Sequence, residues 1–167
     1  MLIQEIRNAT IRLTYGGIKF LIAPLFAPKE AYEPFPEGLL PGKPWPFHNL
    51  PMQPEEIVNG IDAVIMTHYH LDHFDEYAVK ALDKTIKIFA QDEYDRKVLQ
   101  DFGFANTEII SENGTEFKGI TLYKTECLHG VREKIQPYCD AMHIRPDAMG
   151  IVFNAPDEKT LYLAGDT

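Results

Sequence analysis

The sequence is poor in cysteine, with Cys127 and Cys139 as the two examples among 167 residues. Two cysteines cannot form the disulfide framework that stabilises many small secreted proteins. No apolar run approaches the ~20 residues that a membrane span needs. Residues 1–7 lack the basic segment followed by an apolar stretch that is typical of a signal peptide. These absences predict a cytoplasmic protein with no membrane partner.

Basic residues are also scarce, because Lys and Arg total 16 against 25 Asp and Glu, which gives a formal charge of −9. A surface of this sign repels phosphate backbones, so we expect no nucleic-acid partner. Hydrophobic residues make up 45% of the chain, which is enough to form a core and to exclude intrinsic disorder. The length suits a single domain, residues 1–167.

Strand-like and helix-like apolar patterns alternate along the chain, which predicts an α/β fold. The first two expected strands flank Gly16-Gly17, a typical hairpin turn. The continuous apolar run 63–66 predicts a strand buried on both faces. Residues 131–146 fit either a loop or a helix. The expected strands are 10–15, 18–22, 63–66, 86–90, 107–110, 120–126, 150–154 and 160–164. The expected helices are 75–82, which Asp75 caps, and 92–102.

Residues 24–54 hold nine of the twelve prolines. Proline lacks the backbone donor that sheets and helix interiors need, so this segment is expected to be a long irregular loop. The loop also carries four aromatic residues, Tyr32, Phe35, Trp45 and Phe47. Two interpretations are open: a flap over a functional site, or a cap packed on its own aromatic side chains. His48, alone in this loop, is expected to be an ordinary surface residue.

Four potential metal ligands, His68, His70, Asp72 and His73, lie within six residues of one another, directly after the buried strand. Imidazole and carboxylate groups are the usual ligands of zinc and other first-row divalent metals. In an extended stretch His68 and His70 point to the same side and can bind one ion together. Asp72 and His73 project differently and can reach a second ion. The spacing therefore favours a two-metal site over a structural metal or a group of solvated loop histidines.

The segment Thr67-His68-Tyr69-His70-Leu71-Asp72-His73 resembles the His-x-His-x-Asp-His signature of the metallo-β-lactamase superfamily, and residues 161–167 resemble its later strand ending in Gly-Asp-Thr. The chain is most similar to small bacterial hydrolases of the ascorbate-6-phosphate lactonase kind. The resemblance implies a metallo-β-lactamase-like αββα sandwich, of which the chain covers the first half and the strand ending at Asp166.

The resemblance also implies a set of site residues. His68, His70 and His129 would hold a first divalent metal ion, Asp72 and His73 a second, and Asp166 would bridge the two. The expected metal is zinc, with manganese and iron as alternatives. A hydroxide between the metals would be the nucleophile, because a bound metal lowers the pKa of water. Asp72 would be the catalytic residue that orients this nucleophile and handles protons.

The expected function is that of a metal-dependent hydrolase that acts on an ester, lactone or phosphoester of a small metabolite, preferably a phosphorylated or carboxylated one. The alternative is a non-catalytic metal-binding or regulatory module. Two departures from the family pattern motivate this alternative. The first is Ala23, which stands where many relatives have an aspartate that supports the ligands.

The second departure is at the C-terminus, because the family pattern continues into a second βα half that supplies a last histidine. We therefore expect residues 1–167 to be incomplete at the C-terminus. A C-terminal half, a second chain or a homo-oligomer would then complete the fold. One sheet is expected to contain apolar residues from both halves of the chain, namely Val64, Ile65, Ile88, Leu122, Val152 and Leu163.

Four further residues have more ordinary explanations than metal binding. Cys127 is expected to be a buried, inert thiol, with approach to the metal as the alternative. Cys139 is expected to be structural or exposed. His143 is expected at the surface or at the edge of the substrate site. Asp62 either orients a ligand histidine or begins a strand.

Overall fold

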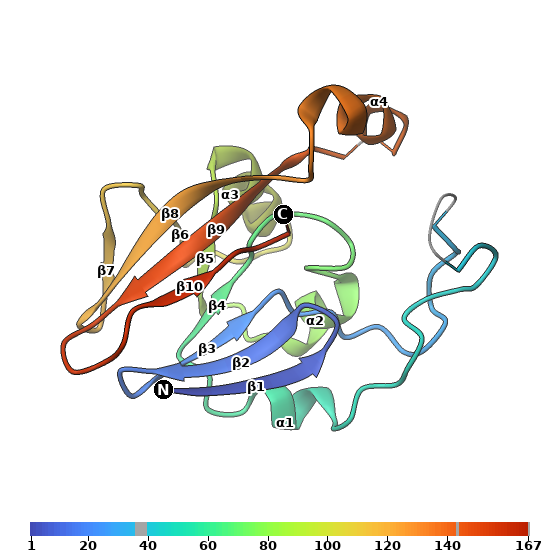
Figure 1. Ribbon diagram of the computed structural model, residues 1–167. Helices are drawn as coiled ribbons and strands as arrows, with labels where there is room; N and C mark the ends of the chain where they lie inside the picture. The colour runs from blue at the N-terminus through green and yellow to red at the C-terminus, as the bar shows by residue number, and fades with distance from the viewer. Residues whose placement is uncertain (36–39, 143, 167) are drawn as a thin grey trace.

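The computed structural model describes residues 1–35, 40–142 and 144–166 and shows two β-sheets packed face to face (Figure 1). The first sheet has six strands in chain order. Its first three strands are antiparallel, and the third to sixth are parallel. The strands are β1 (Leu2–Arg7), β2 (Thr10–Tyr15), β3 (Ile18–Ile22), β4 (Ala63–Ile65), β5 (Lys87–Ala90) and β6 (Thr107–Ile109).

The second sheet is antiparallel, and its four strands lie in the order β10-β9-β8-β7. Its strands are β7 (Thr115–Phe117), β8 (Ile120–Leu128), β9 (Asp147–Asn154) and β10 (Leu161–Leu163). Side chains from both sheets meet in a shared core, where Phe153 packs its ring against Tyr15 and Phe20 at centroid distances of 5.7 and 5.5 Å. The sandwich is therefore held together by apolar burial between two sheets.

Three helices cover the outer face of the six-stranded sheet. They are α1 (Pro54–Val58), α2 (Glu76–Ala81) and α3 (Glu93–Asp101). Ile57, Ala78 and Leu99 from these helices pack in a second core against the sheet. The fourth helix, α4 (Arg132–Met142), lies apart from them at one end of the four-stranded sheet (Figure 1). No helix in the described part of the chain is long and apolar enough to cross a membrane.

The structure confirms the α/β class and most of the expected elements. Gly16 and Gly17 both have positive φ, 55° and 78°, as a tight hairpin turn requires. β4 is buried on both faces, because Ile65 points into the core between the sheets and Val64 into the core beneath the helices. Asp75 accepts a hydrogen bond from the Ala78 amide and caps α2 as expected.

The expectation of a single sheet was wrong. Val64, Ile65 and Ile88 belong to the six-stranded sheet, whereas Leu122, Val152 and Leu163 belong to the four-stranded one. The physical reason is that β8, β9 and β10 satisfy one another's backbone groups in antiparallel pairs. Their inward side chains then bury against the first sheet. Alternation along a strand shows which residues are buried, but not which strand is the neighbour.

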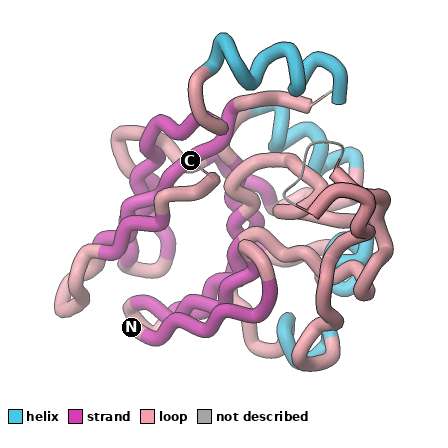
Figure 2. The backbone as a smooth tube through the Cα atoms, turned by 45° about the vertical axis from the view of Figure 1, so that its right-hand side comes forward, coloured by secondary structure: helices cyan, strands magenta, loops and turns pink. Residues whose placement is uncertain are grey.

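No sequence pattern predicted β1, α1 or β7. In β1 the side chains of Leu2 and Ile3 are exposed, so no apolar alternation marks this strand. The segment 131–146, which fitted a loop or a helix, contains α4 with Pro137 inside it. The long loop between β3 and α1 runs beside the sheets on the right of Figure 1 and forms much of the pink tube in Figure 2.

Candidate metal centre

The histidine-rich segment begins where β4 leaves the six-stranded sheet. Two backbone hydrogen bonds fix its start: Met66 N–H donates to the Phe89 carbonyl at 2.9 Å, and Met149 N–H donates to the Thr67 carbonyl at 3.2 Å. The second bond joins the segment to β9 of the other sheet. The side chains that follow are therefore presented at one edge of the sandwich, where both sheets contribute residues.

The first group of potential ligands consists of His68, His70 and His129. One ring nitrogen of each lies within 4.8 Å of the others. The Nε2 atoms of His68 and His129 are 3.1 Å apart. Two nitrogens bound tetrahedrally to one zinc ion at normal bond lengths are separated by about 3.3 Å. This spacing therefore fits a shared metal ion.

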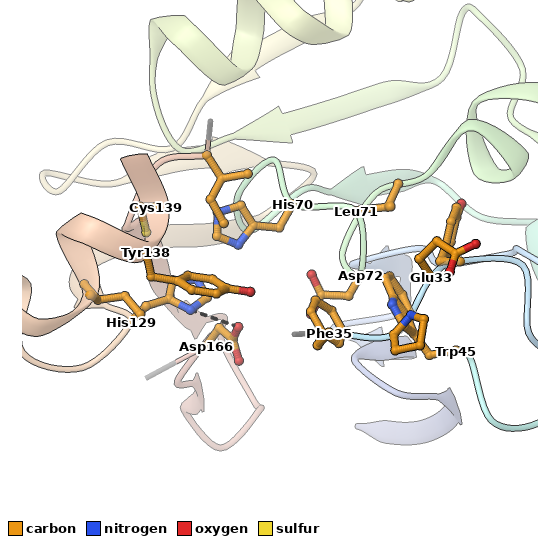
Figure 3. A pocket seen from close by; sticks show the side chains of 14 residues that line it. Glu33, Phe35, Trp45, His70, Leu71, Asp72, His129, Tyr138, Cys139 and Asp166 are labelled. Carbon is orange, nitrogen blue, oxygen red and sulfur yellow. Dashed lines mark ion pairs between the residues drawn. The ribbon is translucent and has the colours of Figure 1, made fainter. Parts of the chain in front are cut away.

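The second group consists of His68, His73 and Asp166, again with ligand atoms within 4.8 Å of one another. Asp166 Oδ2 lies 3.4 Å from His73 Nε2 and 3.3 Å from His129 Nδ1, and the latter contact is dashed in Figure 3. Asp166 thus touches members of both groups, which is the position that a bridging ligand requires. Asp72 lies outside both groups, with Oδ2 3.7 Å from His73 Nε2.

Contacts behind the rings determine which nitrogen faces the centre. His70 Nε2 lies 2.7 Å from the Arg145 carbonyl, which can only accept, so Nε2 carries the proton and Nδ1 is the free ligand atom. Thr67 Oγ1 lies 3.2 Å from His68 Nδ1 and 3.4 Å from His73 Nδ1. This hydroxyl can accept from both rings, which leaves their Nε2 atoms free for metals.

The charges in the centre favour cation binding. Burial, reinforced by the neighbouring histidines, lowers the pKa of His68 to about 2 and also lowers the pKa of His70. The His73 ring beside it lowers the pKa of Asp166 to about 2, against the opposing effect of burial. At neutral pH His68 and His70 are therefore neutral imidazoles and Asp166 is an ionised carboxylate, the protonation states that bind metals.

Gly165 explains how Asp166 reaches this position. It has a φ of +74°, and an added Cβ would lie 2.4 Å from the Met149 carbonyl oxygen. A side chain here would therefore push the end of β10 away from β9. The Gly-Asp pair acts as a unit, because glycine permits the close turn and the aspartate that follows occupies the centre.

A cavity of about 550 Å³ opens in front of these ligands (Figure 3). The long loop forms one side of the cavity and α4 forms the other, which is the position that the flap interpretation requires. Stacking among Tyr32, Trp45 and Phe35 shows that the loop also packs on its own aromatics. Among the described residues no lysine or arginine lines the cavity, whose walls are Tyr32, Glu33, Pro34, Phe35, Trp45, His70, Leu71, Asp72, His129, Ile135, Tyr138, Cys139, Ile144 and Asp166.

The structure resolves several single-residue alternatives. Asp62 accepts from the Lys19 amide and the Lys118 ammonium, so it ties strand ends together and contacts no ligand histidine. Cys127 is a buried thiol, and burial raises its pKa. Cys139 is buried in the cavity wall rather than exposed. His48 is exposed, as expected, and His143 lies outside the described residues.

Ala23 has a positive φ of 47° and is buried. Its amide donates to the Ile65 carbonyl, and its carbonyl accepts from Thr10 Oγ1. The position therefore contributes backbone contacts between β3 and β4, just before the ligand segment.

Sequence reasoning missed a supporting network beneath the histidine segment. The buried Asp95 carboxylate accepts from the Tyr69 amide at 3.1 Å and from Gln91 Nε2 at 2.8 Å, and burial raises its pKa to about 6. Arg145 pairs with Asp92 and Asp147, and its carbonyl holds His70. These partners lie in or just before α3 and β9, and nothing in the local sequence shows that they lie beneath the ligands.

Comparison with known proteins gives a consistent family assignment. Residues 33–167 match the model of the beta-lactamase superfamily domain. The UPF0173 protein YddR of Bacillus subtilis is 44% identical over 167 residues, which are 100% of this chain and 63% of that protein. The chain therefore spans less than two thirds of the length of this relative.

Two solved structures are similar along the same portion. The isothiocyanate hydrolase from Delia radicum gut bacteria has 41% identity and a TM-score of 0.89, with 99% of this chain and 62% of that chain covered. A possible metal-dependent hydrolase from Veillonella parvula has 39% identity and a TM-score of 0.91, with the same coverage. The expectation that a further segment or a second chain completes the domain stays a prediction.

Proposed function

The chain belongs to the family of beta-lactamase superfamily domains. From this premise we propose that it is a metal-dependent hydrolase of small, uncharged molecules. One observation carries the proposal. His68, His70 and His129, from two distant segments, bring their ring nitrogens within 4.8 Å of one another at the base of an apolar cavity. Imidazoles that converge in this way are typical of a metal site with an open face.

The proposal includes two divalent cations, with zinc as the preferred metal and manganese or iron as alternatives. One cation would be held by His68, His70 and His129, and the other by Asp72 and His73. Asp166 would bind both cations. When bound, such cations activate a coordinated water and polarise the group under attack. A cytoplasmic location also belongs to the proposal, and the two free, buried cysteines support it.

Asp72 is proposed as the carboxylate that orients the attacking water and takes up its proton. Its side chain lines the cavity and is 38% exposed. It can therefore contact a substrate while it remains close to His73. Asp166 lines the same cavity, but its carboxylate contacts the rings of both His73 and His129, whereas the Asp72 carboxylate lies 3.7 Å from the His73 ring.

The walls of the cavity favour an uncharged substrate. Its charged side chains are Glu33, Asp72 and Asp166, all acidic, and the described lining contains no cationic side chain to pair with a phosphate or carboxylate. Tyr32, Phe35 and Trp45 offer apolar surface instead. We therefore propose a neutral ester, lactone or isothiocyanate rather than the phosphorylated or carboxylated metabolite that the sequence favoured. The similarity to an isothiocyanate hydrolase supports the last of these classes.

Turnover of matched substrates by the zinc-loaded protein tests this proposal. Phenyl acetate and phenyl phosphate share a leaving group and differ in charge, and benzyl isothiocyanate adds a second neutral electrophile. We expect hydrolysis of at least one neutral compound and little of the phosphate. The His68→Ala/His70→Ala variant, which lacks ligands, should be inactive.

Preferential hydrolysis of phenyl phosphate would contradict the substrate class. Tight zinc binding without turnover of any compound would instead favour the non-catalytic metal-binding or regulatory module. Asp72→Asn separates chemistry from binding, because it should lower kcat more than it lowers metal content.

A further inference from the structure

Two side chains of opposite charge hold the long loop at its start. Arg7 is buried, and its guanidinium donates to the carbonyls of Leu25 at 3.0 Å, Ala27 at 2.8 Å and His48 at 2.8 Å. From the other side, the buried Asp75 carboxylate accepts from the Phe26 amide at 3.1 Å and the Ala27 amide at 2.7 Å. A cation and an anion thus fix opposite faces of residues 25–27.

Asp75 also makes contacts outside residues 25–27. It lies two residues after the ligand His73, and it caps α2 through the Ala78 amide at 2.8 Å. Its Oδ2 also accepts from the Tyr32 hydroxyl at 3.2 Å. Burial and the Asp75 carboxylate raise the pKa of Tyr32, so the hydroxyl keeps its proton and remains the donor. One carboxylate therefore contacts both the end of the ligand segment and the loop.

Tyr32 is connected to the other aromatic residues that line the cavity. Tyr32 and Trp45 exchange two backbone hydrogen bonds, at 2.8 and 3.0 Å, and their rings are 4.7 Å apart. Phe35 stacks on Trp45 at 4.8 Å with an interplanar angle of 15°. We call Tyr32, Phe35 and Trp45 the aromatic wall. Figure 3 shows Phe35 and Trp45 across the cavity from His129 and Asp166.

We propose that the hydrogen bond from Tyr32 to Asp75 sets the separation between the aromatic wall and the metal ligands, and that Tyr32 is thereby a positioning residue for substrate binding. The geometry gives the bond this role because Asp75 belongs to the ligand side of the cavity while Tyr32 carries the opposite wall. The effect on catalysis rests on the proposed function, whereas the effect on the wall does not.

Tyr32→Phe tests the proposal because it removes one hydroxyl and keeps the ring. Trp45 is the single tryptophan of the 167 residues, so its emission reports directly on the wall. We expect a shifted Trp45 emission and weaker quenching by benzyl alcohol, a neutral aromatic probe that is not hydrolysed. Zinc content should be unchanged. KM for phenyl acetate should rise by about fivefold, with kcat within about twofold, as the loss of one hydrogen bond predicts.

Tyr162→Phe is the matched control, because Tyr162 is an exposed tyrosine on β10 that does not line the cavity. Its emission, quenching and KM should equal those of the wild type. If Tyr32→Phe leaves Trp45 emission and benzyl alcohol quenching at their wild-type values, the proposal is overturned. Absence of turnover in the wild type would contradict the proposed function alone, since the fluorescence measurements would still decide the role of Tyr32.

Discussion

At the scale of single residues, the centre depends on side chains that are buried and held from behind. His68, His70 and His73 are all buried, and each makes a contact through the ring nitrogen that faces away from the centre. Burial disfavours the protonated form of His68 and His70, so both are ready to bind a cation. Preorganisation of this kind lowers the cost of assembling a site.

Removal of two ligands at once should abolish metal binding. The His68→Ala/His70→Ala variant loses two of the three nitrogens of the first group and one member of the second. Elemental analysis after gel filtration should therefore find no retained zinc. His48→Ala changes an exposed loop histidine and should retain the wild-type amount. A full metal complement in the double variant would refute the site.

Asp95 should make stability depend on pH. Its pKa in the fold is raised to about 6 from an ordinary value of 3.8, so folding favours the protonated acid. The stabilisation from this proton is present below pH 3.8 and is lost as the pH rises through about 6. The Asp95→Asn variant cannot titrate. Its free energy of unfolding relative to the wild type should rise by up to about 3 kcal/mol between pH 4 and 7.

Urea unfolding across this pH range measures the difference. Asp101→Asn, at an exposed position of the same helix, is the control and should show a difference from the wild type that does not follow this titration. If the free energies of unfolding of Asp95→Asn and the wild type differ by the same amount at every pH, the Asp95 carboxyl group does not titrate in this interval.

At the scale of elements, the long loop is an ordered wall rather than a linker. Its proline content prevents regular structure, yet Leu25, Ala27 and Trp45 form a buried cluster with partly buried Tyr32 and Phe47. The loop gains this order from side chains outside it, namely Arg7 on β1 and Asp75 before α2. A loop of this kind can shape a binding cavity because its anchors are rigid elements.

Loss of the Arg7 anchor should loosen the loop selectively. Arg7→Met leaves three loop carbonyls without their donor and should cost about 3 kcal/mol of stability. Trypsin should then cleave faster after Lys29, which is followed by Glu30. Arg12→Met is the matched control, because Arg12 makes one exposed hydrogen bond to the Asn59 carbonyl. Equal cleavage rates in the two variants would contradict the anchoring role.

At the scale of the whole molecule, the two sheets depend on one shared core. Phe153 is fully buried, its ring contacts Tyr15 and Phe20 of the first sheet, and its carbonyl accepts from the Tyr15 hydroxyl. The ligands come from both sheets, since His68 follows β4 and His129 follows β8. Packing between the sheets therefore sets the geometry of the candidate metal centre as well as the stability of the fold.

Truncation of the Phe153 side chain should destabilise the sandwich, and this effect should extend to the candidate metal centre. Phe153→Ala removes a fully buried ring and should lower the free energy of unfolding by about 3–5 kcal/mol. Urea denaturation gives this value, and zinc titration shows whether the affinity falls with it. Tyr162→Ala, on the exposed face of neighbouring β10, should change stability far less. A loss below about 1 kcal/mol for Phe153→Ala would contradict a shared core.

The sequence by itself determined the features that arise from neighbouring residues. Gly16-Gly17 specifies a tight turn, Asp75 caps a helix, and the apolar run 63–66 specifies a strand buried on both faces. The close spacing of His68, His70 and His73 indicated a metal site without any further information. Each of these signals works over a few residues, where backbone preference and side-chain periodicity act directly.

The tertiary structure decided what lies opposite these features. His68 and His129 are 61 positions apart, and their contact requires the two sheets to pack in a particular register. The same holds for Asp95 beneath Tyr69 and for Tyr32 on Asp75. A carboxylate on a helix looks the same in the sequence whether it faces water or another segment. These contacts arise because burial of the shared core fixes where each element lies, and no local pattern records that position.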